Sequence, residues 1–265
     1  MACRFTRRFL ALSILCAAAL HADPIKVRQS QGTERGFLLI RSESGVVLGH
    51  GDLIQTAHGS RVTSELALHF KDGSLDDETV VYTQTGVFRL ISDHHIQKGP
   101  FFHSPVDLLV QANGDVTNRS IGKDGKEKVD TQHLDLPPDV YNGMIGPLLS
   151  NISPTTQPLK LGMVVAAGDK VRLVHLNISP TTPQKFSVAG LSYNATVFRI
   201  HIELGGVAGV VAPIVGKQPG DIFVWVVEGA APQFMRMLGP LANGGPAVSI
   251  ELSGASFRDA GEDAH

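Results

Sequence analysis

An aspartate and two histidines stand together in the first half of the sequence, as Asp93-His94-His95, and His103 follows nearby. Histidine and carboxylate side chains are common zinc ligands, so these four residues form a candidate metal site. Successive side chains on a strand point to opposite faces, so only one of His94 and His95 should reach a given ligand. One hypothesis is a metal-dependent hydrolase that uses this cluster. The alternative is a polar strand end before the turn Lys98–Pro100.

A second candidate is the row Arg199, His201 and Glu203, which alternates with apolar residues. This spacing predicts a strand with the three polar side chains on one face. A His–Glu pair could perform general acid–base catalysis, whereas such a row more often forms the wet face of a half-buried sheet. We take Arg199 and His201 as candidate ligand-binding residues.

An apolar bend with little charge, Gly205 to Gly220, follows this strand and contains Val207 and Val211. An exposed apolar patch of this size rarely lacks a role. We therefore predict that the bend closes the end of a curved sheet and borders a ligand opening. Trp225, in the apolar strand that comes next, completes the predicted ligand-binding set.

Asp76, Asp77 and Glu78 follow Asp72 and form an acidic cluster that we place in a hairpin loop. Carboxylate oxygens on a turn suit a calcium ion, but the spacing does not match an EF-hand loop. The simpler interpretation is a set of solvated loop acids.

The first 22 residues have the pattern of a secretory signal peptide, with arginines followed by an apolar run and then small residues. We expect cleavage after Ala19 or Ala22 and a periplasmic or secreted protein. The pair Arg7-Arg8 leaves both the general secretory route and the twin-arginine route open.

Both cysteines, Cys3 and Cys16, lie in this leader. The remaining chain therefore has no thiolate metal site, cysteine nucleophile or disulfide. It keeps 20 basic and 25 acidic residues, because the leader contains three arginines and no acid. This balance argues against nucleic acid as a partner. No Gly-x-Ser-x-Gly elbow or P-loop is present, and we expect no cofactor.

Alternating segments and turn residues predict a mainly β (α+β) fold with one domain over 23–253 and a flexible tail over 254–265. An antiparallel meander is expected from Gly36 to Ile96, and Asn113-Gly114 is a strong hairpin signal. Apolar residues at helical spacing predict one packed helix near 138–150. No later segment is long enough for a transmembrane helix.

Successive antiparallel strands with one helix, in an exported cysteine-free chain, resemble the lipoprotein-carrier-like half-barrels of bacterial envelopes. The resemblance lies in the meander from Arg61 to Ile96 and the hairpins from Leu159 to Leu204. It implies a strongly curved sheet around an apolar cavity for acyl chains. The whole sequence is also similar to a group of uncharacterised bacterial envelope proteins, for which no activity is implied.

These observations favour a non-catalytic envelope protein that binds a lipid-like or apolar ligand, or an envelope partner, on a concave sheet face. The metal-dependent hydrolase and a structural protein without a ligand remain the alternatives.

Overall fold

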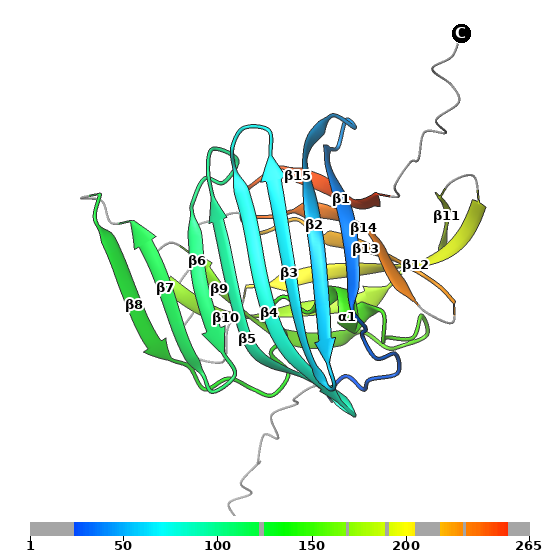
Figure 1. Ribbon diagram of the computed structural model, residues 1–265, viewed down its shortest axis with the longest axis horizontal. Helices are drawn as coiled ribbons and strands as arrows, with labels where there is room; N and C mark the ends of the chain where they lie inside the picture. Colours follow the sequence, from blue (N-terminus) through cyan, green and yellow to red (C-terminus); the bar gives the residue numbers. More distant parts are fainter. Residues whose placement is uncertain are drawn as a thin grey trace, which may run out of the picture.

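The computed structural model describes residues 24–121, 125–167, 170–188, 191–204, 218–229 and 232–253. Their main feature is one curved antiparallel sheet, which confirms the mainly β prediction. Figure 1 shows strands β1–β8 as a layer in front, with β9, β10 and β12–β14 crossing behind it. The strands are β1 Glu34–Ser42, β2 Val47–His58, β3 Arg61–Phe70, β4 Leu75–Thr85, β5 Val87–Lys98, β6 Val106–Gln111, β7 Asp115–Ile121, β8 Glu127–His133, β9 Leu159–Ala167, β10 Lys170–Pro180, β11 Gln184–Val188, β12 Leu191–Glu203, β13 Ile222–Val227, β14 Gln233–Pro240 and β15 Ala247–Ser253.

The strand order is β8-β7-β6-β5-β4-β3-β2-β1-β15-β14-β13-β12-β10-β9, and β11 pairs with β12. The predicted meander corresponds to β1–β5, and the predicted Asn113-Gly114 hairpin joins β6 to β7, with Gly114 at φ +96°. The described strands form an unclosed sheet, so it is a half-barrel with a concave inner face.

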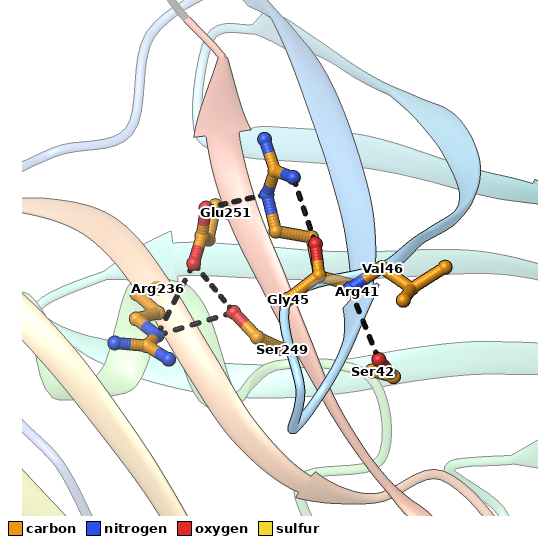
Figure 2. A network of polar contacts seen from close by, with 7 residues as sticks. All are labelled: Arg41, Ser42, Gly45, Val46, Arg236, Ser249 and Glu251. Atoms are coloured by element: carbon orange, nitrogen blue, oxygen red, sulfur yellow. Dashed lines mark hydrogen bonds and ion pairs between the residues drawn. The ribbon is translucent and has the colours of Figure 1, made fainter.

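The first and last strands are neighbours, because β1 pairs with β15 in a register that places Ile40 opposite Ile250. Both of these side chains are buried on the inner face. On the outer face, Glu251 lies between Arg41 at 3.5 Å and Arg236 at 3.4 Å (Figure 2). Ser249 donates a hydrogen bond to Glu251 at 2.7 Å, so polar contacts span the junction of β1, β15 and β14.

The segment 139–149 fills part of the concave side. Its residues Tyr141, Met144, Leu148 and Leu149 are almost completely buried. The helix within it, α1 (Ile145–Leu149), is shorter than the predicted 138–150. The preceding residues follow the edge of β9 instead, and Gly143 adopts φ +65°, which no α-helix contains.

Two sets of hydrogen bonds tie this segment to β9. Gly162 donates to the Asp139 carbonyl at 2.9 Å, and its own carbonyl accepts from the Tyr141 backbone at 3.0 Å. The Asn142 amide then both donates to and accepts from the Val164 backbone, at 2.8 and 2.9 Å. The side chain of Asn142 thus imitates a peptide unit and prolongs the pairing along the β9 edge.

At Gly143 this segment packs closely against the inner faces of β4 and β5. A Cβ atom at this position would lie 2.9 Å from Val80 Cβ and 3.1 Å from Asp93 Oδ1. Only glycine combines this close approach with a positive φ at low cost. In the part of the chain that is described, no helix is long and apolar enough to cross a membrane.

We predict that Gly143→Ala lowers the free energy of unfolding by about 2–4 kcal/mol, because positive φ and a crowded Cβ both add cost. Gly86→Ala is the matched control: Gly86 has φ +70° but no atom within 4 Å of the added Cβ. The control should lose only about 1–2 kcal/mol. Urea unfolding measures both values, and equal losses would contradict close packing at Gly143.

Candidate functional site

An interior cavity of about 760 Å³ lies on the concave side of the sheet. Most of its wall is apolar and comes from both layers of strands. The apolar lining includes Leu38, Leu53, Leu66, Leu68, Val80, Leu108, Ile145, Met163, Val174, Ile202, Ile222, Val224, Met237, Ile250 and Leu252. Alternation explains this lining, because every second residue of a strand faces the same side of the sheet.

A polar part of the wall is built by β4 and β5, and other segments add the charged side chains of Glu34, Arg35 and Arg172 to the lining. Asp76 and Glu78 on β4 face inward, as do His95 and Gln97 on β5, and all four line the cavity. Glu78 stands opposite His95 in the register, and Asp76 stands opposite Gln97. Asp93 faces the same side from β5 and is 1% exposed. We call Asp76, Glu78, Asp93 and His95 the acidic end of the cavity.

In this set, Asp76 is the carboxylate with a hydrogen-bond partner for each of its two oxygens. His95 Nε2 lies 2.8 Å from Asp76 Oδ1, and Gln97 donates to Asp76 Oδ2 at 2.9 Å. Burial lowers the pKa of His95, but the hydrogen bond to Asp76 and the charges of Glu78, Asp76 and Asp93 outweigh it and raise the pKa to about 9. His95 is therefore a cation at neutral pH, paired with Asp76.

Glu78 and Asp93 lack such partners. No hydrogen bond reaches Glu78 from the described residues, and neither carboxyl oxygen of Asp93 has a partner there. Burial raises the pKa of Glu78; His95 lowers it in part, and Asp76 raises it further. Burial raises the pKa of Asp93 well above its ordinary value, and Glu78 adds to this, whereas His95 and Asn142 oppose it. Both groups hold their protons more tightly than free carboxylic acids do.

The predicted metal residues are divided between the two faces of β5. Asp93 and His95 face inward, and His103, in the loop after β5, also lines the cavity. His94 faces outward, where its Nε2 lies 2.9 Å from Asp107 Oδ1. Within the described ranges, no group of three or more His, Cys, Asp or Glu residues is arranged to hold a metal ion.

The predicted ligand-binding residues do not line the cavity where they are described. Arg199 and His201 lie on the outer face, both paired with Asp221, beside a shallow hollow of about 370 Å³. Trp225 is also on the outer face: its indole N–H donates to Gln184, and the Arg236 guanidinium lies 5.1 Å from its ring. Val207 and Val211 lie outside the described residues.

Sequence reasoning placed Asp76 and Glu78 in a loop, and that placement was wrong, because β4 begins at Leu75. A signal was available. Asp76 and Glu78 are spaced by two from Val80 and Tyr82, which are buried on the inner face of the same strand. Extending that alternation backwards would have placed both carboxyls inside.

The fold and the cavity define an antiparallel β half-barrel with a ligand-sized interior. No protein-family model matches the sequence, and no curated protein matches it. One similar solved structure is the crystal structure of a β-barrel-like protein of domain of unknown function DUF1849 from Brucella abortus. It is 10% identical, with a TM-score of 0.44, over 86% of this chain and 98% of that one. A likeness of this degree carries no conclusion about function.

We predict that Asp93→Asn becomes increasingly more stable than the wild type as the pH rises from 4 to 8. A carboxyl with a raised pKa in the folded state supports folding below its unfolded pKa, and that support is lost as the pH rises through the folded pKa. The difference should grow with pH, because only the wild type has a carboxyl group at this position whose ionisation is opposed by burial.

Urea unfolding at each pH measures this difference. Asp77→Asn, on the outer face of the neighbouring strand β4, controls for the loss of one carboxyl. A difference for Asp93→Asn that stays constant with pH would show that its pKa is the same in the folded and unfolded chains.

Proposed function

We propose that this protein is a non-catalytic exported envelope protein that binds a lipid-like or other apolar ligand inside its half-barrel. The observation that carries the proposal is the interior cavity of about 760 Å³ with its mainly apolar wall. This volume falls within the range of about 300–1,000 Å³ that is usual for small-molecule sites.

The energetics of transfer support an apolar ligand. Each methylene group moved from water into such a wall contributes about 0.8 kcal/mol, so a chain of some ten carbons supplies enough to offset the entropy cost of association. The wall is contributed by distant parts of the chain, from Leu38 on β1 to Leu252 on β15, so the cavity is a product of the whole sheet. Acyl-chain binding is also what the resemblance to lipoprotein-carrier-like half-barrels implies.

Binding is favoured over metal-dependent hydrolysis by the position of the histidines. His94 is held on the outer face by Asp107, and His95 is held inside by Asp76, so the two cannot share a ligand. The pairing of His95 with Asp76 also occupies the carboxylate nearest to it.

The test compares two neighbouring residues of β2 that face opposite sides. Leu53 lines the cavity, whereas Ile54 is 37% exposed on the outer face. We predict that Leu53→Trp weakens binding of the neutral apolar fluorophore N-phenyl-1-naphthylamine about tenfold or more, because the indole occupies ligand volume. Ile54→Trp should bind as the wild type does.

Fluorescence titration gives the affinities, and native mass spectrometry of the purified protein shows whether a ligand is already bound. A wild type that neither binds the fluorophore nor carries any extractable lipid would favour the structural alternative. Equal binding by both variants would place the ligand outside the cavity.

Export is supported by the leader pattern of residues 1–22. We predict that residues 1–30 export a fused reporter enzyme that needs disulfides and so is active only outside the cytoplasm. Ile14→Arg, a charge inside the apolar run, should abolish that activity. Equal reporter activity with and without the substitution would refute the assignment.

A further inference from the structure

We propose that the acidic end of the cavity recognises an ammonium group, so that the ligand is a cationic amphiphile with an amine at one end of an apolar chain. This inference rests on the proposed function and narrows the ligand class.

The acidic end of the cavity contains more carboxyl groups than hydrogen-bond donors to pair with them. Three carboxyls, those of Asp76, Glu78 and Asp93, share one imidazole, and that imidazole is hydrogen-bonded to Asp76. Gln97 supplies its amide to Asp76 as well. Among the described residues, neither carboxyl oxygen of Asp93 has a hydrogen-bond partner, and Glu78 interacts with His95 and Asp76 through charge. Unpaired buried carboxyl groups are costly, so their retention calls for a compensating group.

Glu78 is the member that a ligand can reach. Its side chain lines the cavity, so the surface it exposes faces the interior space. Asp93 lies behind it, 1% exposed and covered by Gly143, whose added Cβ would sit 3.1 Å from Asp93 Oδ1 and 3.2 Å from Glu78 Cδ. A group arriving from the cavity would therefore meet Glu78 directly, with Asp93 behind it.

The neighbouring wall suits the rest of such a ligand. On β3, Leu66 stands opposite Glu78 and Leu68 stands opposite Asp76, and both leucines line the cavity. An apolar chain lying on these leucines would bring its end group to Glu78. An ammonium group has three donors and no acceptor, which matches a site that has carboxyl oxygens to fill.

The affinity for an ammonium ligand should depend on pH, because carboxyl groups at the site titrate. The charged or titratable groups that face Glu78 are Asp76 on its own strand and His95 and Asp93 on β5; β3 presents leucine and the 139–149 segment presents glycine. Burial raises the pKa of Glu78 and of Asp93 above the ordinary value for a carboxyl group. An incoming cation favours their ionised forms, so binding should release protons and tighten as the pH rises toward the raised pKa values of these two groups.

The experiment uses three probes of equal chain length below their micelle concentrations: dodecylammonium, dodecanol and dodecanoate. Isothermal titration calorimetry at pH 7 should show dodecylammonium binding at least tenfold more tightly than dodecanol. Glu78→Gln should remove that preference while keeping dodecanol binding, which also shows that the cavity is intact. Glu65→Gln, an exposed acid beside Leu66 on the outer face of β3, is the matched control and should keep the preference.

Titrations of the wild type in two buffers of different ionisation enthalpy count the released protons and do not depend on any variant folding. The inference is overturned by equal binding of the amine and the alcohol, by tighter dodecanoate binding, by an unchanged preference in Glu78→Gln, or by zero proton release. Each of these leaves apolar binding itself in place. If none of the three probes binds, the proposed function fails as well.

Discussion

The architecture depends on the contact that segment 139–149 makes between the β9 edge and the inner face of β4 and β5. A curved antiparallel sheet exposes unpaired backbone at its edges and an apolar concave face, and both are unfavourable in water. The segment meets both needs at once. Asn142 hydrogen-bonds to the Val164 backbone, while Tyr141 and Met144 enter the core. Gly143 permits the close approach because it has no side chain.

This segment occupies only part of the concave space, and the cavity is what remains. The apolar cores on either side are continuous with its wall: Val80 and Val224 belong to the main cluster, whereas Leu38 and Ile250 belong to the second one, beside the β1–β15 pairing. A completely filled interior would be more stable, since empty apolar volume forfeits packing contacts. The unfilled volume is thus a cost in stability that a bound ligand would offset.

The acidic end of the cavity also lowers stability, because burial disfavours the ionised forms of two of its carboxyl groups. Asp76 and His95 compensate each other as a hydrogen-bonded pair of opposite charge, whereas Glu78 and Asp93 have raised pKa values because burial disfavours their ionised forms. Polar groups held in this condition concentrate at functional sites. The same β4 and β5 strands carry apolar residues at Val80, Tyr82 and Phe88, so the polarity is confined to one end of the strand pair.

The sequence alone determined the mainly β class, the hairpins at Asn113-Gly114 and after Phe70, and the opposite orientation of His94 and His95, because turn chemistry and the two-residue period are local properties. It also predicted a helix near 138–150 between the two sets of strands, but the helix is confined to Ile145–Leu149, after Gly143. Only the tertiary structure decided which face of each strand became the inside. Arg199, His201 and Trp225 proved to lie outside, while Asp76 and Glu78 lie within. That choice depends on which strands become neighbours across the sheet, such as β1 with β15, and no short stretch of sequence contains this information.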